Sequence, residues 1–382
     1  MAKDSTDIKE TIGALDDYVL LGRSGLRISP LCLGSLTFGE TFGIGSNYEE
    51  SKKVFDYYFE KGGNFIDTAN MYNLGESERF LGEYIADKRS QVVISTKYTA
   101  NVTTLVPNVR NNPNAGGNHR KSLVENLDES LKRLSTGYID LLYVHIWDLR
   151  TPIEETMRSL DDVVRSGKVL YVAISDSPGW VISRANTIAE LRGWSRFIGL
   201  QTRYNLIDRA LEHEIQSSCA ELDVGIIPWG CVAEGFLTGK YTKEKIDNLK
   251  KSGDLISLRN SSLVSTAESE QNWQILDEVM AIAAETKRSP AQVALNWISQ
   301  KPGITSPLIG ARTKAQLVEN LKALEFKLTP EQMARLDAVS APKEVPFPYS
   351  LYGSLDKFIG KTIQIPDKYK PVFKLGAQEK WA

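Results

Sequence analysis

Short apolar runs alternate with segments of helical periodicity along most of the chain. The helical segments repeat their apolar residues every three or four positions, as in Met157, Leu160, Val163 and Val164. The apolar runs are of strand length, and they span residues 31–34, 64–67, 92–97, 139–145, 169–175, 197–201, 224–229 and 306–310. The pattern therefore predicts eight strands that alternate with helices.

Three of the predicted helices begin with the same sequence device. Thr151-Pro-Ile-Glu154, Ser289-Pro-Ala-Gln292 and Thr329-Pro-Glu-Gln332 each combine a hydroxyl residue, a proline and a Glu or Gln three positions after the hydroxyl. This is the signature of a capping box with proline in the first helical turn. We therefore expect Thr151, Ser289 and Thr329 to be N-caps.

Alternation of strand and helix demands right-handed crossovers and a parallel sheet. Eight such units fit a closed (β/α)₈ barrel better than an open sheet. Two apolar runs around Gly22-Arg-Ser-Gly25 predict a β-hairpin over residues 18–29, ahead of the barrel. We expect an α/β fold in which residues 18–340 form one TIM-barrel domain, preceded by an extension at 1–17 and followed by a tail at 341–382.

Three successive predicted strands end in a polar residue. Asp67, Lys97 and His145 close these strands, and Tyr72 follows Asp67 by five positions. Because neighbouring parallel strands lie roughly 4.8 Å apart, the three residues should emerge side by side at the carboxyl rim, where barrel active sites lie. Each residue alone has an ordinary structural explanation, but four proton-handling groups on neighbouring strand ends predict catalysis.

Charge and cysteine usage exclude several classes of partner. The chain has 46 basic and 48 acidic residues, so it offers no electrostatic basis for binding nucleic acid or a membrane. The charged start and the lack of any long apolar stretch predict a soluble, cytoplasmic protein with small-molecule partners. Cys32, Cys219 and Cys231 have no metal-ligand spacing, so we expect structural thiols and no metal.

Nucleotide-binding signatures of the common kinds are absent from the sequence. No Gly-x-Gly-x-x-Gly joins a predicted strand to a helix, and Gly235-Phe-Leu-Thr-Gly239-Lys240 is one residue short of a phosphate loop. Arg312, by contrast, follows the last strand at the start of a helix, where a guanidinium and a helix N-terminus together suit a phosphate.

Six motifs, in order, resemble those of the aldo-keto reductases over roughly residues 18–340. They are Phe65-Ile-Asp67-Thr-Ala-x-x-Tyr72, Ser95-Thr-Lys97, Tyr138-Ile-Asp-Leu-x-x-x-His145, Gln201-x-x-Tyr-Asn205, Leu237-Thr-Gly-Lys-Tyr241 and Ile309-Gly-Ala-Arg312. Within that superfamily the chain resembles the aryl-alcohol dehydrogenase and potassium-channel β-subunit side. The resemblance implies a barrel that binds NADPH without a Rossmann motif and reversibly reduces aldehydes or ketones.

The resemblance also implies a role for each site residue. The catalytic residues would be Asp67, Tyr72, Lys97 and His145. The cofactor-binding residues would be Ser35, Leu36, Asp67, Ser175, Asp176, Gln201, Trp229, Gly230, Cys231, Val232, Glu234, Leu237, Lys240, Arg259, Gly310, Arg312, Gln316, Glu319 and Asn320. Asp176 stands where asparagine is usual in the family, and Gly230-Cys231 replaces Ser-Pro, so we expect altered contacts at these positions.

The residue chemistry is consistent with carbonyl reduction. Hydride delivery builds negative charge on the carbonyl oxygen, so an acid must supply a proton near neutral pH. Tyr72 is the candidate acid, and we expect the Lys97 cation to lower its pKa from about 10. Asp67 would hold Lys97 in place, and His145 would donate a hydrogen bond to the substrate oxygen.

A second function remains open. A regulatory subunit could bind NADPH as a sensor with little turnover, as the channel β-subunits suggest, although His145 in place of the asparagine of that branch favours the enzyme. Two segments also allow alternatives: the loop at 99–118 is expected to wall the substrate pocket, and the aromatic tail after Pro342 could line the pocket mouth or form a subunit contact.

Overall fold

The computed structural model describes residues 11–106, 108–252, 258–360 and 364–370. Eight parallel strands form one sheet in the order β10-β3-β4-β5-β6-β7-β8-β9. The strands are β3 (Cys32–Gly34), β4 (Phe65–Asp67), β5 (Val93–Tyr98), β6 (Ile139–Val144), β7 (Val169–Ser175), β8 (Phe197–Arg203), β9 (Gly225–Trp229) and β10 (Leu308–Gly310). A parallel bridge between Ile226 and Ile304 brings β9 close to the segment that enters β10. Each predicted run overlaps one of these strands, with β5 and β8 extending one and two residues beyond their runs, so the predicted (β/α)₈ barrel is confirmed.

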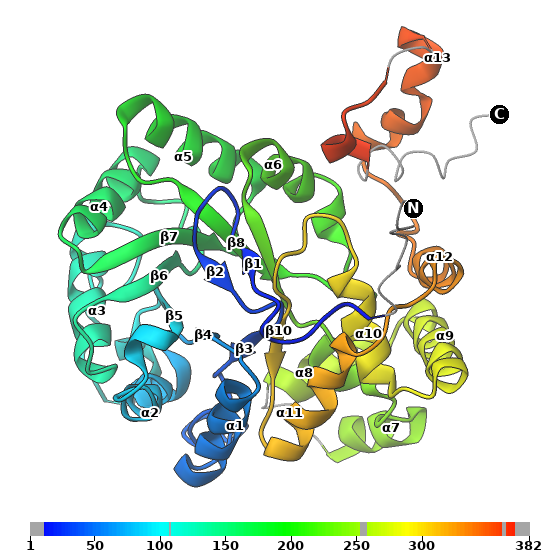
Figure 1. The fold of residues 1–382 in the computed structure, drawn as a ribbon, viewed down its shortest axis with the longest axis horizontal. Helices are drawn as coiled ribbons and strands as arrows, with labels where there is room; N and C mark the ends of the chain where they lie inside the picture. The colour runs from blue at the N-terminus through cyan, green and yellow to red at the C-terminus, as the bar shows by residue number, and fades with distance from the viewer. Residues whose placement is uncertain (1–10, 107, 253–257, 361–363, 371–382) are drawn as a thin grey trace, which may run out of the picture.

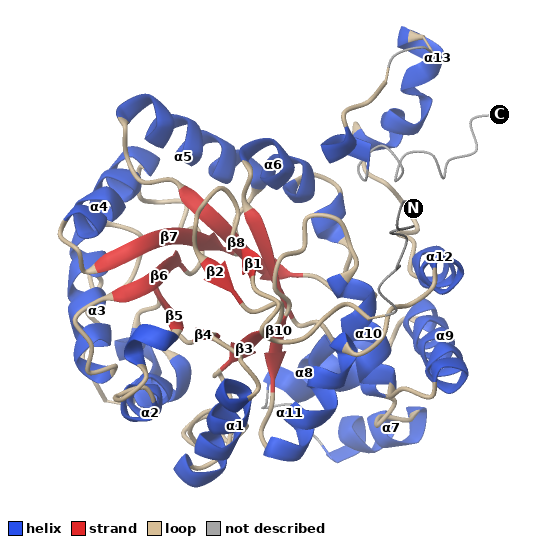
Figure 2. Cartoon of the chain, in the orientation of Figure 1, coloured by secondary structure: helices blue, strands red, loops and turns tan. Residues whose placement is uncertain are grey.

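Helices surround the strands, as Figure 2 shows. They are α1 (Tyr48–Glu60), α2 (Glu76–Tyr84), α3 (Arg120–Arg133), α4 (Ile153–Arg165), α5 (Gly179–Arg192), α6 (Ile215–Leu222), α7 (Lys243–Ser252), α8 (Leu258–Thr266), α9 (Glu270–Thr286), α10 (Pro290–Ser299), α11 (Lys314–Leu321), α12 (Pro330–Val339) and α13 (Leu355–Ile359). The 3₁₀ turns are η1 (Tyr72–Gly75), η2 (Arg89–Gln91), η3 (Val102–Leu105), η4 (Ala210–Glu212), η5 (Ala233–Thr238), η6 (Lys322–Leu324), η7 (Tyr349–Ser354) and η8 (Asp367–Tyr369). In α4 the predicted stripe of Met157, Leu160 and Val163 is buried, because a 3.6-residue period places these side chains on one face.

Side-chain alternation along the strands divides the interior into two apolar clusters. On β4, Ile66 joins the cluster between the strands and the helices, whereas Phe65 joins the cluster inside the barrel. On β5, Ile94 and Val93 divide in the same way. Since the side-chain period of a strand is two, Asp67 must share the inward face of Phe65. The barrel interior nearer the amino ends of the strands is therefore apolar, and polar groups occupy the carboxyl end.

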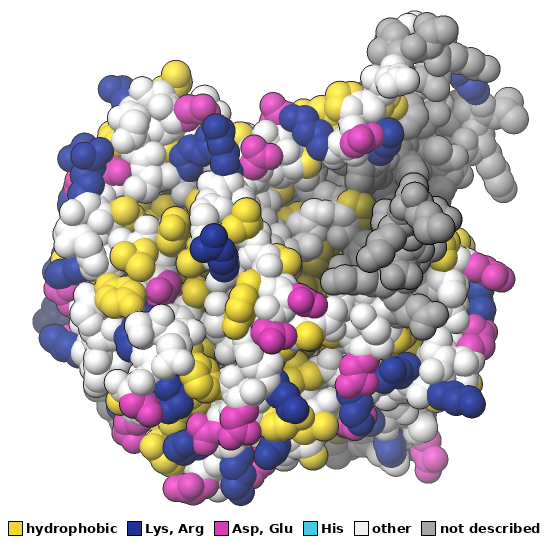
Figure 3. All heavy atoms as spheres, viewed as in Figure 1, with side chains coloured by type: hydrophobic (Ala, Val, Ile, Leu, Met, Phe, Trp, Pro, Cys, Tyr) yellow, Lys and Arg dark blue, Asp and Glu magenta, His cyan; other side chains and the backbone are white. Residues whose placement is uncertain are grey.

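A β-hairpin closes the amino end of the barrel. Its strands are β1 (Val19–Leu20) and β2 (Arg27–Ile28), which confirms the predicted hairpin. Leu21 and Ile28 are fully buried in the interior cluster, and the hairpin overlies the ring of strands in Figure 1. Figure 3 shows the same end, where acidic and basic side chains are interspersed. The hairpin thus excludes water from the barrel on the side opposite the strand ends.

Two of the three predicted capping boxes are present. Ser289 caps α10 and Thr329 caps α12, each with the reciprocal Gln bond of a capping box. The prediction for Thr151 was wrong, because α4 has Pro152 as its N-cap residue and no side-chain cap. The Thr151 hydroxyl instead donates to Asp148 Oδ2 at 2.8 Å. The Thr151 hydroxyl therefore bonds to the Asp148 carboxylate and does not cap α4.

Two parts of the described tail contact the outside of the barrel, whereas α13 projects away from it (Figure 1). Tyr349 stacks on His213 with ring centroids 6.0 Å apart, and Lys368 pairs with Glu221 of α6 at 2.7 Å. Phe347 and Phe358 are largely exposed. Parts of the predicted extension (1–10) and tail (361–363 and 371–382) lie outside the described residues, and the division into 1–17, 18–340 and 341–382 stays a prediction. Among the described helices, none combines the length and apolar character needed to cross a membrane.

The tight contact at Gly22 makes the hairpin sensitive to a single methyl group. Gly22 has φ +52°, and an added Cβ would lie 2.1 Å from the carbonyl oxygen of Ile198. We expect Gly22→Ala to lower the free energy of unfolding by at least about 1–3 kcal/mol, because positive φ and overpacking both oppose it. Urea denaturation followed by circular dichroism measures this loss.

Gly25→Ala is the matched control, because an added Cβ there meets nothing within 4 Å. It should change the free energy of unfolding by less than about 0.5 kcal/mol. Equal stability of the two variants would contradict the packing described for the hairpin.

Candidate active site

A buried ion pair lies at the carboxyl end of the barrel. The Lys97 ammonium donates to Asp67 Oδ2 and, at 2.8 Å, to the carbonyl oxygen of Thr68. The other carboxylate oxygen accepts from Ser95 Oγ at 2.8 Å and from Gln201 Nε2 at 3.0 Å. The side chains of Lys97 and Asp67 are at most 1 % exposed. Complete pairing is what allows two charges to be buried here.

Tyr72 lies beside this pair. Its hydroxyl oxygen is 3.3 Å from Lys97 Nζ, and the ammonium lies 5.0 Å from the centre of its ring. The next residue, Asn73, is left-handed with φ 48°, and its amide donates to the carbonyl oxygens of Leu36 and Phe38. Asn73 therefore anchors the turn that holds Tyr72 at the strand ends.

His145 directly follows β6 and contacts Tyr72. The two rings form an edge-to-face pair with centroids 6.2 Å apart. His145 also lines a cavity of about 390 Å³, together with Thr99, Ala100, Asn101, Pro113, Gly116, Gly117, Ile146, Asp148 and Arg150. Most of these residues belong to the 99–118 loop. The structure thus places this loop beside His145, as expected for a pocket wall.

The local environment sets the protonation of the three proton-handling groups. Burial has the largest single effect and lowers the pKa of Lys97, but the attraction and hydrogen bonds of Asp67 and Tyr72 together raise it overall, so the ammonium stays charged. Burial lowers the pKa of His145 to about 3, and the Lys97 cation adds to this effect. Burial raises the pKa of Tyr72, whereas Lys97 lowers it. Lys97 thus acts in the expected direction, but the net direction for Tyr72 is upward, so the expected net lowering was wrong: desolvation outweighs the cation. Tyr72 is therefore a protonated phenol and His145 a neutral imidazole at neutral pH.

Several predicted cofactor residues lie around this centre. Ser175 and Gln201 are register partners on β7 and β8. Trp229 Nε1 donates to Asp176 Oδ1 at 3.0 Å, which fixes the indole relative to the residue after β7. Burial raises the pKa of Asp176, and the Trp229 bond opposes that rise. The departure from asparagine at Asp176 thus still supplies an acceptor for the indole.

Two further predicted residues follow β3. Ser35 is fully buried, and its hydroxyl donates to the backbone oxygen of Asp67 at 2.8 Å. Leu36 is 40 % exposed. Ser35 therefore supports the strand end that carries Asp67, while Leu36 presents an apolar surface.

The segment after β9 has an irregular backbone that suits an anion. Gly230 has φ +70° and Glu234 has φ 53°, so left-handed residues interrupt the segment. Within the described residues, the backbone amides of Cys231 and Val232 have no acceptor. Successive amides in such a turn form an anion-binding concavity. This segment therefore fits a phosphate group.

Two residues that were predicted to bind the cofactor in or near this segment, Leu237 and Lys240, differ in exposure. Leu237 is fully buried, and its amide donates to the carbonyl oxygen of Val232 at 3.2 Å. It therefore holds the backbone of the segment from the core side. Lys240 is exposed, and its backbone oxygen accepts from Lys245.

The remaining predicted residues lie on or near α8 and α11. Arg312 is exposed and makes no ion pair with any residue in the described ranges. Its amide donates to Gln316 Oε1 at 2.9 Å, and Asn320 Nδ2 donates to the carbonyl oxygen of Gly310 at 3.3 Å. Glu319 instead pairs with Lys322 and accepts from Gln292. Arg259 falls within α8, but its side chain lies outside the described part of the chain.

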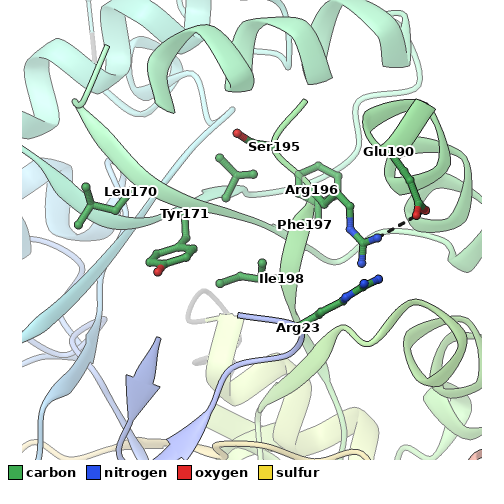
Figure 4. Close-up of a pocket in the computed structure, with 9 residues that line it drawn as sticks. Arg23, Leu170, Tyr171, Glu190, Ser195, Arg196, Phe197 and Ile198 are labelled. Carbon is green, nitrogen blue, oxygen red and sulfur yellow. Dashed lines mark ion pairs between the residues drawn. The ribbon is translucent and has the colours of Figure 1, made fainter. Parts of the chain in front are cut away.

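A second cavity of about 460 Å³ lies at the amino ends of β7 and β8, near the hairpin (Figure 4). Arg23 and Arg196 point into it, and Arg196 pairs with Glu190 at 3.5 Å. None of the predicted site residues lines this cavity. It is separate from the polar cluster at the strand ends.

Sequence reasoning missed several residues of the site. Ser95 bonds Asp67 directly, and strand alternation could have identified it, because it lies two residues before Lys97 on the same face of β5. Asn205 donates to the carbonyl oxygen of Gly230 at 2.9 Å, and Thr99 accepts from the amide of His145 at 3.2 Å. No local sequence signal identifies these last two contacts.

Comparison with known proteins places these residues in a wider context. The model of the Aldo/keto reductase family matches residues 30–341. The chain is 36 % identical over 341 residues to a putative aryl-alcohol dehydrogenase of Saccharomyces cerevisiae, covering 88 % of this chain and 89 % of that protein. It is 34 % identical over 335 residues to a norsolorinic acid reductase of Aspergillus flavus, covering 86 % and 82 %. It is 33 % identical over 337 residues to an aryl-alcohol dehydrogenase [NADP(+)] of Phanerodontia chrysosporium, covering 86 % of each.

The depressed pKa of His145 predicts a pH dependence of stability. Unfolding returns the imidazole from a pKa of about 3 toward 6.5, so between these values the unfolded chain binds the extra proton. This contribution to stability is therefore present above pH 6.5 and is lost as the pH falls toward 3. We expect the free energy of unfolding to fall more steeply from pH 7 to pH 4 in the wild type than in His145→Gln. Urea midpoints across this range measure the difference, and parallel slopes would show that His145 is not held neutral in the fold.

Proposed function

Because the chain belongs to the aldo/keto reductase family, we propose that it catalyses the reversible, NADPH-dependent reduction of aldehydes or ketones to alcohols, with Tyr72 as the proton donor. The family membership confirms the resemblance seen in the six sequence motifs. It supports an oxidoreductase that acts on a small-molecule carbonyl compound. The single observation that carries the finer proposal is the 3.3 Å approach of Lys97 Nζ to the Tyr72 hydroxyl.

The proposed role of Tyr72 follows from its environment. NADPH, when bound, supplies the hydride that adds to the carbonyl carbon. Tyr72 is a protonated phenol, which is the form that can donate a proton to the developing alkoxide. Lys97 remains a cation beside it and stabilises the phenolate that proton donation leaves behind. Asp67 keeps that cation charged and fixed.

His145 is proposed to orient the substrate. It is neutral, so it donates a hydrogen bond to the carbonyl oxygen without adding a second cation beside Lys97. The cavity that it lines would hold the substrate body between the strand ends and the 99–118 loop. Apolar lining from Pro113 and Ile146 suits an uncharged hydrocarbon or aromatic portion.

The proposed cofactor residues would divide among three parts of NADPH. Ser175, Asp176, Gln201 and Trp229 would meet the nicotinamide end, and Trp229 is preset by its bond to Asp176. The free amides after Gly230 would meet the pyrophosphate. Arg312, exposed and without an ion pair in the described residues, would meet a phosphate at the adenosine end. The relative named for NADP(+) supports this choice of cofactor.

The alternative of an NADPH sensor with little turnover predicts a different kinetic behaviour. A sensor would bind NADPH and oxidise it very slowly with every carbonyl compound offered. The close grouping of Tyr72, Lys97 and His145 favours the enzyme, because cofactor binding alone does not require an acid poised at a substrate cavity.

Replacement of the proposed acid tests the function. Tyr72→Phe should lower kcat for reduction of an aromatic aldehyde by about 10²–10⁴, the contribution of a positioned general acid, while NADPH affinity stays unchanged. Loss of nicotinamide absorbance gives the rate, and quenching of tryptophan fluorescence gives the affinity.

Tyr171→Phe removes the same hydroxyl group from the second cavity and should leave kcat unchanged. Wild-type turnover in Tyr72→Phe would rule out Tyr72 as the acid. A wild-type protein that binds NADPH and reduces no carbonyl compound would promote the sensor.

A further inference from the structure

Thr99 has an unusual backbone conformation at the mouth of the candidate site. It directly follows β5, and its φ is +100°. A β-branched residue at positive φ is a genuine outlier, since its side chain crowds the backbone there. Such strain persists only where the surroundings impose it, and it concentrates at functional sites. The contacts of Thr99 should therefore show what holds it in this conformation.

Asn118 imposes this conformation from the far end of the 99–118 loop. It is fully buried, and its side-chain amide donates to Thr99 Oγ1 at 2.9 Å and to the carbonyl oxygen of Ile146 at 3.0 Å. Its Oδ1 accepts from the amide of Asp148 at 2.8 Å. The Gly117 amide adds a 2.8 Å bond to the carbonyl oxygen of Thr99. The two ends of the loop and the segment after β6 are thus tied together through one asparagine.

The Thr99 hydroxyl, which Asn118 holds in place, also bonds to the backbone of His145. It accepts from the His145 amide at 3.2 Å, a donor that also faces the Tyr98 carbonyl oxygen at 3.3 Å. Thr99 and His145 line the same cavity. The hydroxyl therefore fixes the backbone from which the imidazole projects.

The imidazole itself has little else to hold it. Its Nδ1 atom is buried and has no hydrogen-bond partner among the described residues. A histidine that works as a donor is commonly oriented by a bond to its second ring nitrogen. Here that bond is missing from the described structure, and the ring contacts Tyr72 edge-to-face. The direction of the ring consequently depends on the backbone after β6.

We propose that Thr99 is a positioning residue for His145. Its hydroxyl, held by Asn118, aligns the imidazole with Tyr72 and the substrate cavity. The catalytic consequence rests on the proposed carbonyl reduction, whereas the alignment of His145 does not. Among the described residues, neither Thr99 nor Asn118 hydrogen-bonds to a residue proposed to bind NADPH, so the effect should fall on turnover and leave cofactor binding unchanged.

The test compares four variants of the full-length chain. Thr99→Val removes the hydroxyl at constant shape, and Thr99→Ser restores it. Thr99→Gly also lacks the hydroxyl but adopts positive φ freely, so it stays informative if the valine variant fails to fold. Thr187→Val is the control, because Thr187 is an exposed residue of α5 whose hydroxyl donates to the carbonyl oxygen of Ser183, one turn earlier in the same helix.

Two readouts separate alignment from turnover. The chain has 3 histidines, so ring signals of isotope-labelled histidine can be assigned by His145→Asn and followed by NMR at neutral pH. Steady-state reduction of a nitrobenzaldehyde gives kcat, and fluorescence titration gives NADPH affinity. We expect Thr99→Val and Thr99→Gly to shift the His145 signals, with those of His213 unchanged, and to lower kcat by about ten- to a hundredfold, as small misalignments do. Thr99→Ser should restore both, and Thr187→Val should match the wild type.

The outcomes distinguish the two proposals. Wild-type His145 signals in Thr99→Val or Thr99→Gly overturn the positioning role, whether or not kcat falls. Shifted signals with undiminished kcat in an active enzyme also overturn it. Shifted signals in a wild-type protein that reduces no carbonyl compound sustain the alignment and defeat the proposed reduction instead.

Discussion

The buried pair of Lys97 and Asp67 is the constraint on which the candidate site depends. An ammonium and a carboxylate that are at most 1 % exposed would each cost several kcal/mol if left unpaired. Four groups prevent this: Ser95 and Gln201 bind the carboxylate, and Thr68 and Tyr72 bind the ammonium together with Asp67. Together with Lys97 and Asp67, these groups come from three strands, β4, β5 and β8, and from the turns after β4, so the pair requires the closed arrangement of strand ends that the barrel supplies.

Closure of the barrel at its other end makes this pairing stronger. The hairpin residues Leu21 and Ile28 complete an apolar interior beneath the polar groups. Water excluded from that interior cannot compete for Lys97 or Asp67, so their attraction is weakly screened. The same burial raises the pKa of Tyr72 and lowers that of His145. One charged group, the Lys97 cation, thus faces two neutral proton-handling groups, which suits proton donation and hydrogen bonding to a carbonyl oxygen.

The sequence predicted the barrel and its polar rim because both follow from local periodicity. Strand-length apolar runs ended in Asp67, Lys97 and His145, and parallel neighbours must bring such ends together. What it could not predict depends on contacts between distant segments. Thr151 has the sequence of an N-cap, but Asp148 takes its hydroxyl. The direction of the Tyr72 shift depends on how deeply the fold buries the phenol, which no motif encodes. Thr99 and Asn118 meet only after the long loop between them closes.

The predicted cofactor residues also include some whose position the sequence could indicate and some whose position it could not. Trp229 ends β9, Gly230 follows it, and Gln201 lies two residues before the end of β8, so these predicted residues lie toward the carboxyl ends of their strands. Their role in cofactor binding stays a prediction. The motifs could not reveal that Leu237 faces the core, because an apolar residue in a short irregular turn has no periodicity to orient it. Nor could composition locate the tail: Tyr349 meets His213 outside the barrel through a contact between segments far apart in sequence.

If the Lys97 and Asp67 charges enable Tyr72 to donate a proton, removing both charges together should slow carbonyl reduction. The double variant Asp67→Asn/Lys97→Met leaves no unpaired buried charge, so it avoids the instability of either single replacement. Bound NADPH is followed by its fluorescence after mixing with a nitrobenzaldehyde at saturating NADPH. We expect the fluorescence of bound NADPH to decay at least about 10²-fold more slowly than in the wild type. Decay at the wild-type rate would show that Tyr72 does not depend on these charges.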